Sequence, residues 1–286
     1  MRSLTRQHVI FCGFALLIAL LNIEKLWALA QLALVNPTVS HVVGVPFVAL
    51  VLIYGNRDII FSAVRPAPLM GGCLAVAGLA LSILGHNLPT TTLTVAMAGV
   101  ALAWAGVFVM AYGLMSARAA LFPLAFLVFM IPIPTVVVDG ATQFLKHGSS
   151  EAVAGLFTLT GTPFHRQGFV FSLPSFVIEI ADECSGIRSS IALLLTSLLA
   201  GHQFLQKPWT KIALVLLILP IAVIKNAIRI VALSLLAMHV DPSFLTGQLH
   251  HEGGFVFFLL ALGLLAPLFV LLKRSEGTAS EPVRNC

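Results

Sequence analysis

Residues 211–238 read KIALVLLILPIAVIKNAIRIVALSLLAM, and this stretch decides the fold class. It is longer than the about 20 apolar residues that a helix needs to cross about 30 Å of hydrocarbon. Three polar side chains, Lys225, Asn226 and Arg229, stand inside the apolar run. An ionised group at that depth costs at least about 2.5 kcal/mol and normally faces a cavity or a partner. The stretch therefore predicts a transmembrane helix that carries a polar site.

The rest of the chain has the same apolar character. Hydrophobic residues make up 59% of its 286 residues and charged residues only 9%, with a net charge of +5 and a mean hydropathy of +1.02. A soluble domain carries roughly 25% charged residues, and a disordered chain has low hydrophobicity, so both classes are excluded. Lys and Arg are nowhere clustered as they are in nucleic-acid-binding proteins, so no nucleic-acid partner is expected. The composition predicts an all-α polytopic integral membrane protein.

About eight transmembrane helices are expected. The segments that are long and apolar enough are 9–35, 39–56, 67–85, 93–116, 119–138, 187–205, 211–238 and 254–272. Asn22, Glu24 and Lys25 interrupt the first segment, so its span is expected to end near Leu21. The N-terminus also resembles a signal peptide with a cleavage site near Ala30, but this polar interruption favours a retained span.

The distribution of basic residues predicts the orientation. With the N-terminus in the cytoplasm, ten Lys and Arg residues fall in cytoplasmic segments and three in the opposite ones. Both chain termini are therefore expected to be cytoplasmic. The same count leaves Lys25, Lys225 and Arg229 at membrane depth.

Residues 139–186 form the one substantial outer segment of this topology. Residues 141–159 have a roughly helical polar pattern, which is compatible with an interfacial helix that ends at the Gly161-Thr-Pro break. Two short β-type runs around Pro174-Ser175 then predict a hairpin. This hairpin leads to Asp182-Glu-Cys-Ser-Gly-Ile-Arg-Ser-Ser190 at the start of the sixth span.

Cys184 is the first of three polar sites that stand out. It lies at the expected N-terminus of a helix, where the helix dipole favours a thiolate, and Arg188 is one turn further on. The alternative is a small apolar cysteine at a helix start that Asp182 caps.

The second and third sites lie in the seventh span and before the eighth. Arg229 and Lys225 share a helix face, although snorkelling to the surface and, for Asn226, an interhelical hydrogen bond are alternatives. His250, His251 and Glu252 stand together, but the HExxH spacing of a zinc helix is missing, so neither a metal nor a cofactor is expected. A structural loop histidine is the other alternative.

All three sites meet the same, outer membrane face in the expected topology. A thiol, a guanidinium and an imidazole that converge there favour covalent acyl chemistry.

The same residues carry a family resemblance. Cys-Ser-Gly-Ile-Arg-Ser-Ser (184–190), Asn226-x-x-Arg229-Ile230 and His250-x-x-x-Gly254 resemble the exosortase/archaeosortase family of membrane transpeptidases, as do His165-Arg-Gln-Gly168 and Ile178-Glu-Ile. The likeness covers residues 120 to 272. It implies four N-terminal spans (1–118), a catalytic exosortase-like core (119–272) and a short cytoplasmic tail (273–286).

The resemblance implies a bacterial inner-membrane cysteine transpeptidase or protease whose active site faces the periplasm. Its partners would be secreted proteins with a C-terminal sorting tail, composed of a short motif, a hydrophobic helix and a basic cluster. Cleavage would proceed through an acyl-thioester, with transfer to an unidentified acceptor, and the family often accompanies exopolysaccharide production.

The resemblance also implies roles for individual residues. Cys184 would be the nucleophile, and His250, preferred over His251 for its spacing to Gly254, would act as acid/base or as an ion-pair partner. Arg229 would be a proton donor in the family's usual description. A guanidinium is too weak an acid for that task, which favours oxyanion stabilisation instead. Arg188 and Asn226 would support these groups.

Two other classes of function compete with the enzyme. A transporter or channel would use Lys225, Asn226 and Arg229 to line a polar pathway, although these charges gather near one face. A membrane assembly factor would use the outer segment as an interaction surface without chemistry.

Overall fold

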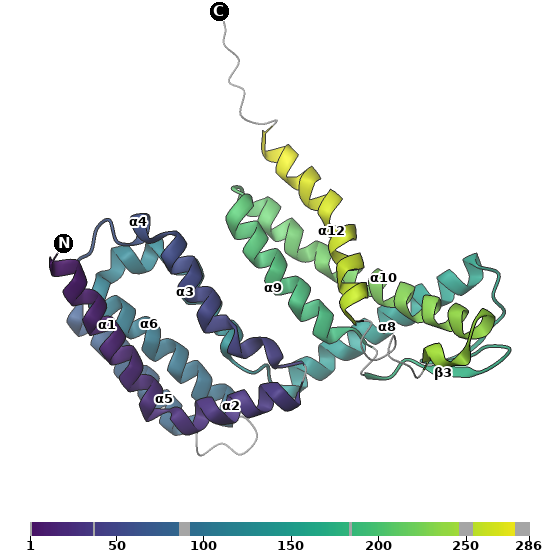
Figure 1. Ribbon diagram of the computed structural model, residues 1–286, viewed down its shortest axis with the longest axis horizontal. Coiled ribbons are helices and arrows are strands. Elements are labelled where there is room, and N and C mark those ends of the chain that lie inside the picture. Colours follow the sequence, from purple (N-terminus) through teal and green to yellow (C-terminus); the bar gives the residue numbers. More distant parts are fainter. Residues whose placement is uncertain (1, 37, 86–91, 183–184, 246–253, 278–286) are drawn as a thin grey trace, which may run out of the picture. The chain divides into compact units, whose positions relative to one another are not determined.

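The computed structural model describes residues 2–36, 38–85, 92–182, 185–245 and 254–277 (Figure 1). The chain divides into two compact units, Met1–Thr135 and Val136–Cys286, and each is considered by itself. The structure is mostly helical, which confirms the fold class. By length and composition four described helices can cross a membrane, within α1, α6, α10 and α12, or five if 121–130 and 135–159 are counted as one span.

Among the residues that the structure describes, the first unit holds nine helical elements. In chain order these are α1 (Arg2–Leu21), α2 (Ile23–Val35), η1 (Ser40–Val43), α3 (Val45–Gly55), α4 (Arg57–Ile60), α5 (Pro68–Leu84), α6 (Thr92–Ala119), α7 (Leu121–Phe126) and η3 (Leu127–Met130). The expected span at 119–138 is not one helix. Its helical part ends at Met130, and α8 begins only at Thr135, because Pro132 and Pro134 lack the N–H groups that would continue the ladder.

The break expected near Leu21 is present, and side chains stabilise it. Asn22 separates α1 from α2, and its amide nitrogen donates to the Ile18 carbonyl at 2.9 Å. The Lys25 ammonium donates to the Ser82 carbonyl at 2.8 Å, to the Ser82 hydroxyl at 3.0 Å and to Asn22 Oδ1 at 3.3 Å. Lys25 is partly buried, and these three acceptors satisfy its charge.

Helices α5 and α6 pack with their backbones in contact. A Cβ atom added to Gly78 would lie 2.4 Å from the Ala103 nitrogen, and one added to Gly106 would lie 2.4 Å from the Ala75 nitrogen. Such small-residue seams are how transmembrane helices approach closely without a hydrophobic driving force. We call this contact the α5–α6 seam; on α5 it comprises Gly71, Ala75, Gly78 and Ser82, and on α6 it comprises Gly99, Ala103, Gly106 and Met110.

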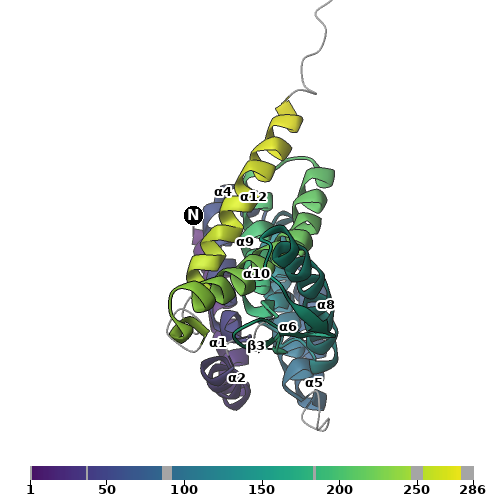
Figure 2. The same cartoon turned by 90° about the vertical axis from the view of Figure 1, so that its right-hand side faces the viewer.

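The second unit combines a helical bundle with a small sheet. Its elements are α8 (Thr135–Leu159), β1 (His165–Gln167), β2 (Val170–Ser172), β3 (Val177–Glu179), α9 (Ile187–Phe204), α10 (Pro208–His239), η5 (Pro242–Leu245) and α12 (Gly254–Gly277). Helices α9, α10 and α12 pack against one another in both views (Figures 1 and 2). Their shared core consists of Leu193, Leu205, Leu214, Ile218, Ile221, Ala261 and Leu265.

The expected hairpin is present as β2 and β3, paired antiparallel with Phe171 opposite Ile178. A third strand, β1, was not predicted; it pairs antiparallel with β2 and places Arg166 opposite Phe171. Buried Phe171 packs with Phe157 of α8 and with Ala227 and Val231 of α10. The sheet therefore rests on the stretch of α10 that carries the polar side chains.

Candidate active site

Helix α10 presents the three polar side chains from one part of its length. Asn226 has none of its surface exposed and Lys225 only 2%, whereas Arg229 is half-buried. Lys225 and Arg229 are one turn apart, so both lie on the same helix face. Since Lys225 does not reach the surface, snorkelling does not account for it.

The Lys225 ammonium binds the first turn of α9. It donates a short hydrogen bond to the Ser189 hydroxyl, and that hydroxyl donates to the Gly186 carbonyl at 2.9 Å. Ser190 also donates to the Gly186 carbonyl at 2.9 Å. This chain of hydrogen bonds ties a buried cation on α10 to the backbone at the start of α9.

Gly186 begins α9 in a left-handed conformation, with φ of 80°. A Cβ atom there would lie 3.1 Å from Asn226 Oδ1 and 3.2 Å from Lys225 Nζ. Both the backbone angle and the close approach of α10 therefore favour glycine. Gly186, and not Asp182, occupies the cap position of α9, so the interpretation of Asp182 as the helix cap was wrong.

Helix α8 supplies a second set of contacts. The Asn226 amide nitrogen donates to the Ser149 hydroxyl at 3.1 Å, between two side chains with no more than 1% exposure. One turn earlier, the buried Lys146 ammonium lies 2.7 Å from Asp182 Oδ1 and over the ring of Phe169, 4.7 Å from its centroid. Asp182 is largely exposed, so solvent screens this pair from its side.

Arg229 lies beside the first turn of α12. Its guanidinium carbon is 6.0 Å from the ring centroid of Phe257, three residues after the start of α12 at Gly254. The same face of α10 thus contacts the start of α9 through Lys225 and the start of α12 through Arg229. Helix α9 begins within the cysteine motif of the sequence, at Ile187, and α12 begins at the last residue of the histidine motif, Gly254.

Cys184, His250 and His251 lie outside the described residues. Their flanks are described: Ser185 is buried, Gly186 is buried against α10, and Gly254 begins α12. Arg188 is exposed on α9, and Asn226 is buried among α8, α9 and α10.

Sequence reasoning missed three groups of this site. Lys146 and Ser149 of α8 and Ser189 of α9 were not singled out, although each makes a contact that organises it. The signal was the helical spacing of Thr142, Lys146, Ser149 and Ser150, which form the buried polar side of α8. No group of three metal-ligating side chains exists within the described ranges.

The arrangement places two cations where two helices begin. A helix N-terminus and nearby cations both stabilise negative charge, whether on a thiolate or on an oxyanion. The site is thus electrostatically suited to nucleophilic acyl chemistry.

The family described as transmembrane exosortase (EpsH) matches residues 27–267. Neither the curated proteins nor the solved structures include a significant match to this chain.

Proposed function

Since this chain belongs to the transmembrane exosortase family, we propose that it is a membrane-embedded cysteine transpeptidase or protease. It cleaves the C-terminal sorting tail of secreted proteins and passes the released end to an acceptor. The observation that supports this most is the buried Lys225–Ser189–Gly186 chain, because it fixes the helix start that follows Cys184 against a buried cation.

In the proposed reaction the Cys184 thiolate attacks the scissile carbonyl carbon of the substrate. The new S–C bond pushes the carbonyl π electrons onto oxygen, and the Arg229 guanidinium donates hydrogen bonds to that oxyanion. One such donor contributes a factor of about 10²–10³ in rate. The oxyanion collapses, the C–N bond breaks, and His250 protonates the leaving amine. An acceptor amine or water then attacks the thioester, His250 takes up the proton that the acceptor loses, and the C–S bond breaks to regenerate the thiolate.

Lys225 acts through its neighbours in this proposal. It holds Ser189 and through it the Gly186 turn, and its charge favours the thiolate over the thiol. Lys146 restrains the other side of the segment through Asp182. Contacts thus hold the segment that carries Cys184 on both sides of the cysteine.

The proposed location is a bacterial inner membrane with both termini cytoplasmic and the active site on the periplasmic side. The catalytic core occupies residues 119–272. Tailed secreted proteins are the substrates, and lipid surrounds the site.

Cys184→Ser tests the proposal with a built-in control. We expect the variant to insert normally and to stop the processing of a tailed partner, detected as loss of the size shift on a gel. Cys73→Ser is the matched control, because Cys73 is a free, exposed cysteine of the first unit. Normal processing by Cys184→Ser, or equal loss in Cys73→Ser, would refute the nucleophile assignment.

A further inference from the structure

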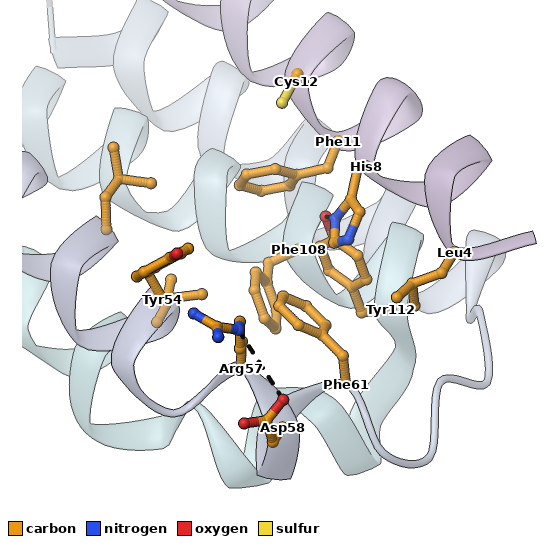
Figure 3. A pocket seen from close by; sticks show the side chains of 12 residues that line it. Leu4, His8, Phe11, Cys12, Tyr54, Arg57, Asp58, Phe61, Phe108 and Tyr112 are labelled. Carbon is orange, nitrogen blue, oxygen red and sulfur yellow. Dashed lines mark hydrogen bonds and ion pairs between the residues drawn. The ribbon is translucent and has the colours of Figure 1, made fainter. Parts of the chain in front are cut away.

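The first unit contains a cavity that the proposed reaction does not use. It has a volume of about 780 Å³ and lies among α1, α3, α4 and α6 (Figure 3). Ligand pockets typically occupy about 300–1,000 Å³. Most of its wall is aliphatic or aromatic, contributed by Leu4, Phe11, Leu50, Ile53, Phe61 and Phe108.

Aromatic rings pack together in the wall, and its inner polar groups are paired. The rings of Phe61, Phe108 and Tyr112 pack at centroid distances of 4.8 to 6.4 Å. His8 Nδ1 and the Tyr112 hydroxyl are 2.7 Å apart, so the wall's two inner polar groups satisfy each other. The interior therefore presents mainly carbon, which suits a hydrocarbon chain.

Two opposite charges stand at the edge of the cavity. The Arg57 guanidinium lies over the Tyr54 ring, 4.4 Å from its centroid, and its Nε is 3.9 Å from Asp58 Oδ1. A charge-assisted hydrogen bond is about 2.7–2.9 Å long, so this pair is not closed. The side chains are 50% and 93% exposed, and both remain accessible to a ligand that carries two charges.

The cavity lies at the basic end of this unit. Exposed Arg65 joins α6 there through its backbone, which donates to the Tyr112 carbonyl at 3.1 Å, and Arg118 follows further along α6. Basic residues of this kind mark the boundary between hydrocarbon and headgroups. In a bilayer, lipid surrounds the protein at the depth of the headgroup boundary, so lipid is the molecule available to fill an apolar cavity there.

We propose that this cavity binds one acyl chain of a phospholipid whose headgroup carries both a phosphate and a primary ammonium. The phosphate pairs with Arg57 and the ammonium donates hydrogen bonds to Asp58. A phosphatidylcholine headgroup offers Asp58 no N–H donor, and a phosphatidylglycerol headgroup offers it no cation. The charges at the edge therefore select phosphatidylethanolamine among lipids with the same chains.

Native mass spectrometry of the full-length protein tests this with an equimolar mixture of phosphatidylethanolamine, phosphatidylcholine and phosphatidylglycerol of identical chains. We expect phosphatidylethanolamine to be retained about three- to fivefold over each of the others, the factor for one exposed charge pair. Asp58→Asn should abolish the preference over phosphatidylcholine. Arg57→Gln should lower retention of all three lipids, whereas Arg118→Gln, an exposed arginine outside the cavity, should not.

Two results would overturn the proposal. One is retention of phosphatidylglycerol at least as strong as that of phosphatidylethanolamine, which would indicate general attraction to the basic end. The other is equal behaviour of the Arg57→Gln and Arg118→Gln proteins. Leu50→Phe, which fills the cavity without touching the charges, adds a second check: retention should fall, and unchanged retention would place the lipid elsewhere.

Discussion

Lys225→Met separates a functional role of the buried cation from a structural one. Methionine has a similar length, and it removes the ammonium that donates to Ser189. We expect this variant to fold at least as well as the original protein while its processing of a tailed substrate falls sharply.

The expected stability change is the difference between the cost of burying the ammonium and the gain from its hydrogen bond. A charged Lys at membrane depth costs about 2.5–3.5 kcal/mol, and Lys225, at 2% exposure, does not escape this cost. Its hydrogen bond to Ser189 stabilises the folded state by about 1.5–3 kcal/mol. Ser189 keeps its bond to the Gly186 carbonyl in the variant, so no buried group loses its only partner. Methionine should therefore raise the free energy of unfolding by roughly 1 kcal/mol or leave it unchanged.

Lys25→Met is the matched control. The Lys25 ammonium has three acceptors on Asn22 and Ser82, so its removal should lower stability by about 1–2 kcal/mol. Processing per folded molecule should not change. Denaturation of purified protein in detergent gives the stabilities, and cleavage of a tailed substrate, normalised to folded protein, gives the activities.

Either of two results would refute a functional role of the Lys225 ammonium. Full processing by Lys225→Met would mean that the cation has no catalytic task. A clear loss of stability would mean that Lys225 is retained to hold α9 against α10.

Three further predictions concern other parts of the chain. Gly78→Leu should prevent the α5–α6 seam from closing and abolish the monodisperse peak in size-exclusion chromatography, whereas Gly72→Leu, with open space around it, should elute normally. Asp182→Asn should reduce kcat several-fold and lower the free energy of unfolding by about 1 kcal/mol or less, because the neutral amide compensates only part of the Lys146 charge. An unchanged kcat would contradict the idea that Lys146 restrains the cysteine segment through Asp182. The Ser243 backbone N–H, 2.7 Å away, holds the pKa of Asp241 below its ordinary value. The stabilisation of the folded state by this carboxylate is present above the unfolded pKa of about 3.9 and disappears as the pH falls through the lower folded pKa. Melting temperatures of the original protein should thus drop more steeply at acid pH than those of Asp241→Asn.

Much of the fold could be predicted because hydropathy acts locally. The helix break at Asn22, the hairpin around Pro174-Ser175 and the long helix that carries Lys225 each follow from a short window of sequence. Their signals are chain-breaking residues, residue alternation and apolar length, which need no knowledge of distant neighbours.

The parts that escaped prediction depend on distant contacts. β1 is three residues long and mostly polar, so only its pairing with β2 makes it a strand. Lys146 and Asp182 are 36 positions apart, and nothing in either local sequence names the other. In the candidate site, α10 could be predicted from its misplaced charges. The polar side of α8 has a helical spacing, but the partners of Lys146, Ser149 and Ser189 depend on contacts between distant segments.

The α5–α6 seam has a mechanical consequence for the first unit. Two helices whose backbones touch at four successive levels cannot slide or rotate without collision, because the added volume of even a methyl group is not tolerated there. The pair therefore moves as one body within the first unit. The cavity wall also includes residues of α1, α3 and α4, which lie outside this pair, so a movement that admits a lipid can involve these helices and leave the α5–α6 seam intact.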